Sequence, residues 1–250
     1  MKLLQALKVA PGDVVAFVGG GGKTTAMFRL AAEIMESGQR VVTTTTTRIF
    51  AAQTRLAPVH VQSLAGLQFA LQTSPHVLLT GEVDPVEGKA FGVSPETIQN
   101  INSQIPNPQI PILIEADGSR MRPFKAPAEH EPVIPDCVTL VVAVIGVEVI
   151  GKPLNERHVH RPELVADIYS GETVTPEMVA AVLSSPLGGR KNVPAGARFI
   201  LLINKVESDE QLQTARAIAG LLLKASGVDG VVIGAVGREG EPVVELANEE

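Results

Sequence analysis

Four consecutive glycines followed by a lysine and two threonines could bind a polyphosphate. Glycine lets backbone amides approach a ligand closely and adopt left-handed φ values, so such a loop can surround phosphate oxygens with N–H donors. A helix that begins at the end of the loop adds the partial positive charge of its N-terminus. Lys23 would reach the β- and γ-phosphates, and Thr24 would offer its hydroxyl to Mg²⁺. The predicted triphosphate and Mg²⁺ site comprises Gly19, Gly20, Gly21, Gly22, Lys23, Thr24 and Thr25.

This loop departs from the strict G-x-x-x-x-G-K-[ST] pattern, because Phe17 stands where the first glycine should be. It fits a shorter G-x-x-G-K-T-T form of the kind seen in Mur ligases. The alternative is a glycine-rich turn with an incidental lysine. The loop lies between an apolar run and an amphipathic helical pattern, and this context favours phosphate binding.

A second acidic motif, Glu115-Ala116-Asp117-Gly118, ends another apolar run. Phosphate-binding enzymes place an acidic residue at such a strand end to hold Mg²⁺ through water, and they also need a group that orients the nucleophile. Two carboxylates two residues apart at a strand end lead us to expect that one faces the phosphates. We favour Asp117 for the metal, with Glu115 as a second candidate catalytic residue. The alternative is that one carboxylate caps a helix or pairs with Arg120.

The run Thr43–Thr47 and Arg48 follow the second predicted strand. Threonine suits strands, so the run could be structural. In a parallel sheet, however, its end would emerge beside the glycine loop. Hydroxyls such as that of Thr46 could then contact Mg²⁺ or a catalytic water, and Arg48 could neutralise phosphate charge.

Asn204-Lys205-Val206-Glu207 resembles the N-K-x-D pattern with which GTPases recognise guanine. Glu207 replaces the aspartate and is one methylene longer. The motif favours GTP over ATP only weakly, and a plain surface turn is the alternative.

Residues 119–136 contain four prolines and many charges, which predicts a long surface loop. Its basic residues Arg120, Arg122 and Lys125 could hold a second anionic substrate.

His158 and His160 could chelate a metal, but two ligands are too few to define a site. Ordinary surface histidines are the favoured interpretation, and a phosphate-contacting loop is the alternative.

Apolar runs that suit strands alternate with helical patterns along the chain, which predicts an α/β fold with a mostly parallel sheet and helices on both faces. Ligands of such sheets bind beyond the carboxyl ends of the strands. We predict one domain over residues 1–250, with lid-like insertions near 81–110 and 146–175 as the alternative. The expected strands are 13–18, 41–42, 77–79, 112–114, 138–145, 199–203 and 231–233, and the expected helices begin near residues 24, 64, 94, 176 and 208.

The composition excludes several classes of protein. A net charge of −6 argues against a protein that coats nucleic acid. The longest apolar stretch, 137–147, is too short to span a bilayer, and the first ten residues are too short for a signal peptide. The one cysteine, Cys137, permits no internal disulfide. These features predict a cytoplasmic protein.

Taken together, the segments VGGGGKTT, VVTTTTTRIF, IEADGSRMRPFKAPAEHEPVIP, VHRPE, PLGGRKN and ILLINKVE resemble the YqeC-type family of selenium-dependent hydroxylase accessory proteins over nearly the whole chain. The resemblance implies a three-layer P-loop NTPase that helps to mature molybdenum hydroxylases carrying labile selenium. It also implies that Lys23 and Thr24 contact the phosphates and that Glu115, Asp117, Arg120 and Lys125 lie in the site.

Three functions remain open at this point. The first is a maturation NTPase that hydrolyses ATP or GTP and acts on a molybdenum hydroxylase or its maturation proteins. The second is a small-molecule kinase or ligase-like enzyme, and the third is a nucleotide-gated scaffold that barely turns over. A homodimer across the nucleotide is a further alternative.

Overall fold

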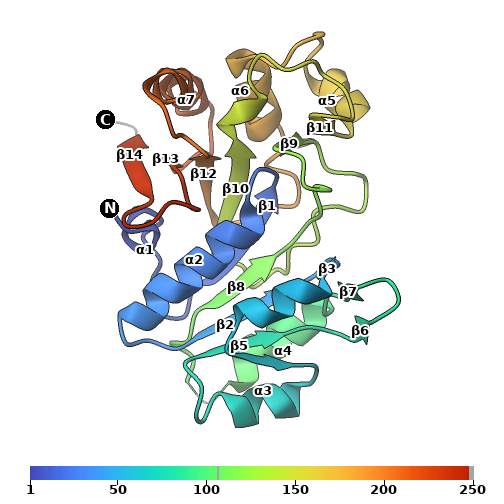
Figure 1. The fold of residues 1–250 in the computed structure, drawn as a ribbon, viewed down its shortest axis with the longest axis vertical. Helices are drawn as coiled ribbons and strands as arrows, with labels where there is room; N and C mark the ends of the chain where they lie inside the picture. Colours follow the sequence, from blue (N-terminus) through green and yellow to red (C-terminus); the bar gives the residue numbers. More distant parts are fainter. Residues whose placement is uncertain (106, 248–250) are drawn as a thin grey trace.

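A nine-stranded sheet forms the centre of the molecule in the computed structural model, which describes residues 1–105 and 107–247 (Figure 1). Its strand order is β14-β13-β12-β10-β1-β8-β2-β5-β4. All neighbouring strands pair in parallel except β13 and β14. The strands are β1 Val14–Gly19, β2 Val41–Thr45, β4 Val59–Val61, β5 His76–Leu79, β8 Ile112–Glu115, β10 Leu140–Gly146, β12 Arg198–Asn204, β13 Gly230–Gly234 and β14 Val243–Ala247.

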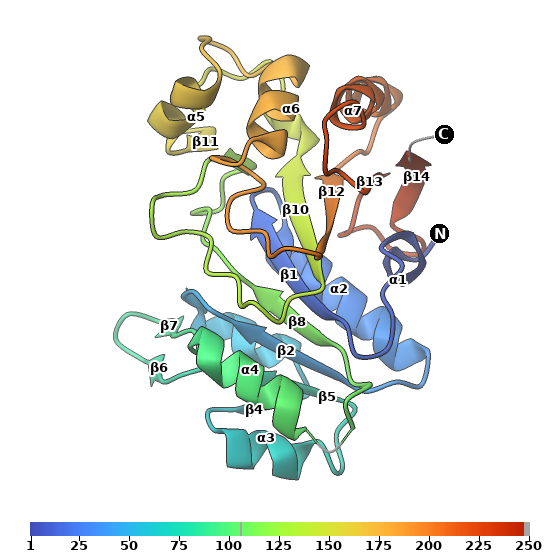
Figure 2. The ribbon, with the colours of Figure 1, turned by 180° about the vertical axis from the view of Figure 1, so that it is seen from behind.

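Helices cover both faces of this sheet, which confirms the predicted three-layer α/β architecture. Helices α1 and α2 cover one face, and α2 crosses the front of the sheet in Figure 1. Residues of α3, α4, α6 and α7 pack in the apolar cluster of the other face, which Figure 2 shows from behind. The helices are α1 Leu3–Ala6, α2 Lys23–Glu36, α3 Leu64–Ala70, α4 Pro95–Gln104, α5 Pro162–Ile168, α6 Pro176–Ser184 and α7 Asp209–Leu222, with short 3₁₀ turns η1 Ala51–Leu56 and η2 Val147–Val149.

The buried strands are aliphatic because both faces of the sheet are covered. Along β1, Val14, Ala16 and Val18 enter one apolar cluster, whereas Val15 and Phe17 enter the other. This alternation follows from the two-residue period of a strand. It explains why the predicted strands read as continuous apolar runs.

Several helix ends agree with their sequence signals. Gly38, one residue beyond the C-cap of α2, has a φ of +81°. Thr175 accepts a hydrogen bond from the amide of Met178 at the start of α6, with Pro176 in the first turn. Ser208 likewise accepts from the amide of Gln211 at the start of α7, and the Gln211 side chain accepts from the amide of Glu207.

The prediction of a long surface loop over 119–136 is wrong at its centre. Phe124 and Lys125 form a short strand, β9, that pairs in parallel with β11, Val159–His160, and residues 124–127 are buried. Three short strands that the sequence did not indicate form a separate antiparallel sheet in the order β3-β7-β6. They are β3 Ile49–Phe50, β6 Val83–Asp84 and β7 Lys89–Ala90.

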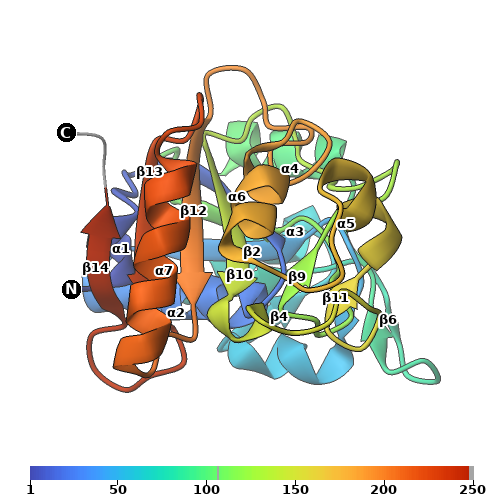
Figure 3. The ribbon, with the colours of Figure 1, turned by 90° about the horizontal axis from the view of Figure 1, so that it is seen from above.

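The prediction of a single domain over 1–250 stays a prediction. Of the two segments proposed as insertions, 81–110 contains β6, β7 and α4, and 146–175 contains η2, β11 and α5. Helices α5, α6 and α7 follow one another along one side of the molecule (Figure 3). Among the described residues, no helix is both long and apolar enough to cross a membrane.

Candidate functional site

The predicted site residues meet at the carboxyl ends of neighbouring strands. β1 leads into the glycine loop and α2, β8 ends at Glu115, and β2 ends at Thr45. A cleft of about 600 Å³ lies there. Its lining residues are Gly21, Gly22, Lys23, Thr24, Thr25, Arg48, Ile49, Phe50, Gln53, Lys89, Glu115, Gly118, Ser119, Arg120, Met121 and Lys205.

The backbone amides of the glycine loop divide into two groups. The amide of Gly19 donates to Asp117 Oδ2 (3.0 Å), that of Gly20 to the Val144 carbonyl (2.9 Å), and that of Gly21 to the Arg122 carbonyl (3.1 Å). The expectation that all four glycine amides face a ligand is therefore wrong for these three. In the described part of the chain, no hydrogen bond uses the amides of Gly22–Thr25. These four amides form the N-terminus of α2 and lie at the cleft, so they are the donors that remain for an anion.

Two glycines are required because the loop packs against the neighbouring backbone. A Cβ on Gly21 would lie 2.1 Å from the amide nitrogen of Gly146, at the end of β10, and Gly21 has a φ of +72°. A Cβ on Gly20 would lie 2.5 Å from the Arg122 carbonyl oxygen. A side chain at either position would push the loop away from β10 and from residues 122–124.

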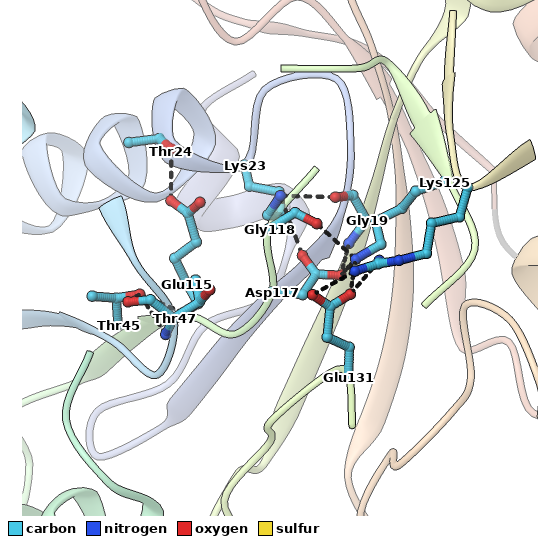
Figure 4. Close-up of polar contacts among 11 residues, drawn as sticks. Gly19, Lys23, Thr24, Thr45, Thr47, Glu115, Asp117, Gly118, Lys125 and Glu131 are labelled. Carbon is cyan, nitrogen blue, oxygen red and sulfur yellow. Dashed lines mark hydrogen bonds and ion pairs between the residues drawn. The ribbon is translucent and has the colours of Figure 1, made fainter. Parts of the chain in front are cut away.

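Lys23 and Asp117 form a buried ion pair beneath the loop (Figure 4). Lys23 Nζ lies 3.2 Å from Asp117 Oδ1 and donates to the Gly19 carbonyl (2.7 Å). Lys125 Nζ lies 3.1 Å from Asp117 Oδ2 and 2.6 Å from Glu131 Oε2. Asp117 therefore pairs with both lysines and accepts a hydrogen bond from the Gly19 amide. The prediction that it holds the metal is not favoured by this geometry.

Glu115 has a different environment. Its Oε2 accepts a hydrogen bond from the Thr24 hydroxyl (2.6 Å; Figure 4). Both residues line the cleft. Burial raises the pKa of Glu115, while the charge of Lys23 and the Thr24 hydroxyl oppose that rise. Register places Glu115 level with Phe17 on β1 and Thr45 on β2, directly beside the glycine loop. Of the two predicted carboxylates, Glu115 is the one that faces the cleft with Thr24.

The hydroxyls of the threonine run are used inside the protein. Thr45 Oγ1 donates to the Glu115 carbonyl (2.9 Å) and Thr46 Oγ1 to the Val133 carbonyl (2.8 Å). The expectation that Thr46 contacts the ligand is therefore not met, because its hydroxyl ties β2 to the loop after Glu131. Arg48 does line the cleft, and it pairs with exposed Glu87 (3.3 Å).

The Asn204 motif also contacts the glycine loop. Asn204 Nδ2 donates to the Gly21 carbonyl (2.7 Å), and Asn204 Oδ1 accepts from the Val236 amide (2.9 Å). Lys205 lines the cleft and forms an ion pair with Glu148. Glu207 is exposed and is not among the residues that line the cleft. Asn204 is thus a positioning residue for the loop, a role that the sequence pattern did not reveal.

The predicted basic residues of the loop 119–131 are separated in space. Arg120 lines the cleft, whereas Arg122 Nε donates to the Glu156 carbonyl (2.7 Å) and Lys125 is buried under Asp117. The expectation that these three hold one substrate together is wrong, because Lys125 is occupied by its carboxylate partners.

His158 and His160 do not form a metal centre in the described residues, which contain no group of three or more potential His, Cys, Asp or Glu ligands. His160 lies on β11 beside Lys125 in the register. Burial, together with the charges of Arg161 and Lys125, lowers the pKa of His160 to about 4, so its ring is neutral near pH 7.

Glu131 joins the loop to β11 and should make stability depend on pH. It accepts hydrogen bonds from Lys125 (2.6 Å) and Arg161 (2.7 Å). Burial alone would raise its pKa, but the Arg161 hydrogen bond and the charge of Lys125 lower it from 4.5 to about 2. A depressed pKa stabilises the folded state above the unfolded-state value, so this contribution of up to about 3 kcal/mol is lost as the pH falls from 4.5 to about 2.

Replacing Glu131 with glutamine should flatten the pH dependence of the free energy of unfolding across that window. Chemical denaturation at several pH values would measure it, with Glu172→Gln at an exposed position as control. An equally steep loss of stability in Glu131→Gln would show that other groups cause it.

The fold and the site together define a P-loop protein of the nucleotide-binding class: a parallel sheet, a glycine loop after β1, and a lysine and a threonine at the start of the following helix. The family model described as YqeC protein matches residues 15–163. A relative from Escherichia coli (strain K12), described as uncharacterized protein YqeC, is 38% identical over 203 residues, which cover 79% of this chain and 77% of the relative. The chain belongs to the YqeC family.

Three solved structures of FtsY show a weaker similarity. The chloroplast FtsY of Physcomitrella patens has a TM-score of 0.47 at 12% identity, and FtsY from Mycoplasma mycoides has 0.34 at 13%. The signal recognition particle receptor FtsY from Elizabethkingia anophelis has a TM-score of 0.39 at 16% identity. The alignments cover 98%, 90% and 92% of this chain, but only 64%, 52% and 63% of those chains. With TM-scores below 0.5, the class of the fold rests on strand order and the glycine loop.

Proposed function

We propose that this protein binds a nucleoside triphosphate with Mg²⁺ and hydrolyses it. The observation that carries the proposal is the set of four amides, Gly22 to Thr25, that have no partner among the described hydrogen bonds and lie at a cleft beside Lys23. A helix N-terminus with several open amides and an adjacent ammonium group is a favourable site for phosphate oxygens. Lys23 would exchange the Gly19 carbonyl for a phosphate oxygen, while Lys125 keeps Asp117 neutralised.

Thr24 and Glu115 are the residues that would hold Mg²⁺. Their oxygens lie 2.6 Å apart at the cleft, and hard oxygen donors are the ligands that Mg²⁺ prefers. One carboxylate and one hydroxyl are a sufficient protein contribution, because Mg²⁺ commonly completes its shell with substrate phosphates and water. When bound there, the ion would neutralise charge on the phosphates. Asp117 is then a positioning residue for Lys23 and the loop, in place of the metal ligand predicted from the sequence.

We further propose that the base of the nucleotide lies at the β12 end of the cleft, near the Asn204-Lys205 motif. Asn204 contacts the glycine loop directly, and the Lys205 side chain lines the cleft at that end. Glu207 makes no contact that favours adenine or guanine, so both ATP and GTP remain candidates.

The proposed biological role is assistance in maturing selenium-dependent molybdenum hydroxylases in the cytoplasm. Its support is the sequence resemblance set out above. A phosphotransferase that acts on a small acceptor is the second candidate function. It is favoured by the continuation of the cleft past the glycine loop to Phe50 and Lys89, which a hydrolase acting on water does not need.

A thermal-shift screen of ATP, GTP and CTP, each with and without Mg²⁺, tests nucleotide binding and the choice of base. A ligand that binds only the folded state raises Tm as its concentration exceeds Kd. We expect a rise with at least one purine triphosphate that becomes larger with Mg²⁺. The absence of any shift with all three nucleotides would contradict the proposal.

The Glu115→Gln variant tests the metal assignment. It keeps the shape of the side chain and removes the charge, so we expect the Mg²⁺-dependent part of the Tm rise and phosphate release to be lost, while binding without Mg²⁺ persists. Glu207→Gln is the control, because that side chain does not line the cleft. A Glu115→Gln protein that retains the full Mg²⁺ effect would exclude Glu115 as a ligand.

A further inference from the structure

The far side of the cleft is a wall that the nucleotide site does not require. We define it by Arg48, Phe50, Gln53 and Lys89, which come from β3, β7 and their flanking residues. Phe50 and Lys89 are partners in the antiparallel register of β3 and β7. The wall is therefore built around β3 and β7 of the small sheet, an element that the sequence did not indicate.

This wall is fixed to the main sheet close to the metal candidates. The amide of Val93 donates to the Thr45 carbonyl (2.8 Å), and the amide of Ala51 donates to the Gly88 carbonyl (2.9 Å). A Cβ on Gly92 would lie 2.4 Å from the carbonyl carbon of Thr46, so β7 returns tightly against the end of β2. The wall is thus held in place relative to Glu115 and the glycine loop.

The strand order separates the wall from the predicted base site. Lys205 follows β12, the glycine loop follows β1, and Arg48 follows β2, with β10 and β8 between them. Four steps of about 4.8 Å place Lys205 and Arg48 roughly 19 Å apart along the sheet edge. A nucleotide with its base near Lys205 and its phosphates at α2 would direct its terminal phosphate towards the wall.

The cleft also carries more positive charge than one Mg²⁺-bound triphosphate needs. Five lysines and arginines line it against the single carboxylate Glu115, in a chain whose net charge is −6. Three of them have carboxylate partners: Lys23 pairs with Asp117, Lys205 with Glu148, and Arg48 with the exposed Glu87. The remaining two are Lys89 and Arg120, which form no ion pair among the described residues.

The same wall offers surfaces for a flat ring. Phe50 is 47% exposed, and Lys89 Nζ lies 3.3 Å from the centroid of its ring. The Arg48 guanidinium lies over Phe91, 4.7 Å from that centroid. Met121, which is 83% exposed, lines the cleft from the loop after β8. Rings and cations alternate here, an arrangement that suits an aromatic anion.

We infer that the wall is a second-ligand site for a small anion that carries a planar ring, held beside the terminal phosphate of the nucleotide. Arg48 and Lys89 pair with its carboxylate or phosphate group, and Phe50 and Met121 contact its ring. The inference rests on the proposed function, because the site is defined relative to the bound triphosphate.

Calorimetry on protein saturated with a non-hydrolysable triphosphate analogue and Mg²⁺ tests this site. The probes are phenyl phosphate and benzoate, which separate the two anionic groups, and benzamide as the neutral match. We expect at least one anion to bind and benzamide not to bind. Lys89→Ala and Phe50→Ala should each weaken the anion about tenfold and leave the affinity for the analogue unchanged, because they remove a charge-assisted contact or the ring surface.

Lys152→Ala is the matched control, since Lys152 is exposed and lines a different cleft. The inference would be overturned, with nucleotide binding intact, if neither anion bound to the unmodified protein. It would also be overturned if the anion bound to Lys89→Ala and to Phe50→Ala as tightly as to the unmodified protein. A parallel loss of affinity for the analogue in these variants would also overturn it, because the wall would then hold the nucleotide itself. If the analogue does not bind to the unmodified protein, that result contradicts the proposed function itself.

Discussion

Replacing Lys23 with methionine is expected to weaken binding of the Mg²⁺-bound triphosphate about 100-fold. The substitution keeps much of the side-chain volume and removes the ammonium group nearest the α2 N-terminus. Hydrogen bonds to charged groups contribute about 1.5–3 kcal/mol each, and about 2.7 kcal/mol corresponds to 100-fold in Kd. Isothermal titration with ATP and with GTP would measure the change.

Lys152→Met is the control for this experiment, because it removes an exposed lysine outside the cleft. The variant should also be checked for folding, since Lys23 is 4% exposed and pairs with Asp117. Lys125 remains beside Asp117 in Lys23→Met, so no carboxylate is left without a cation. Unchanged affinity for both nucleotides would show that Lys23 does not contact phosphate.

Replacing Asp117 with asparagine is expected to lower the free energy of unfolding by about 3 kcal/mol. The Asp117 carboxylate lies within 3.2 Å of Lys23 and within 3.1 Å of Lys125, and all three side chains are buried. Removing one partner from a buried charge network leaves the other charges without compensation, which costs about 3–5 kcal/mol. Glu131 still pairs with Lys125, so the lower end of that range applies.

Urea denaturation would measure the effect, with Glu172→Gln as an exposed control. The same experiment separates the metal-binding role proposed for Glu115 from the structural role of Asp117. Glu115→Gln should change stability less than Asp117→Asn, because burial already raises the pKa of Glu115 and its contact is one hydroxyl. A larger loss of stability in Glu115→Gln would reverse the assignment of Asp117 as the structural carboxylate.

The central part of the fold could be predicted because its sequence signals are local. Buried strands such as β1, β8 and β10 read as apolar runs, and Thr175 and Ser208 mark helix starts through side-chain caps. The small sheet β3-β7-β6 could not be predicted, because its strands have two residues each and no period. The antiparallel edge strand β14 lacks a helix before it, so the βα alternation did not extend to it.

The site was predictable in residue type but not in the direction of each group. Gly20 and Gly21 read as phosphate-binding glycines, yet their amides pair with Val144 and Arg122, residues far away in the sequence. Lys125 reads as a solvent-exposed cation, yet tertiary contacts bury it against Asp117 and Glu131. Neither outcome has a local signal, because both depend on where β9 and β10 pass the loop. The same contacts lead to the proposal that Glu115, and not the predicted Asp117, is the metal ligand.

A crystal structure with a non-hydrolysable triphosphate analogue and Mg²⁺ tests the phosphate site most directly. The β-phosphate is expected within hydrogen-bond distance of the Gly22–Thr25 amides. Lys23 Nζ is expected to have moved from the Gly19 carbonyl to a phosphate oxygen. A nucleotide bound elsewhere, or one bound at the cleft while Lys23 still donates to Gly19 and those amides contact no phosphate, would contradict it.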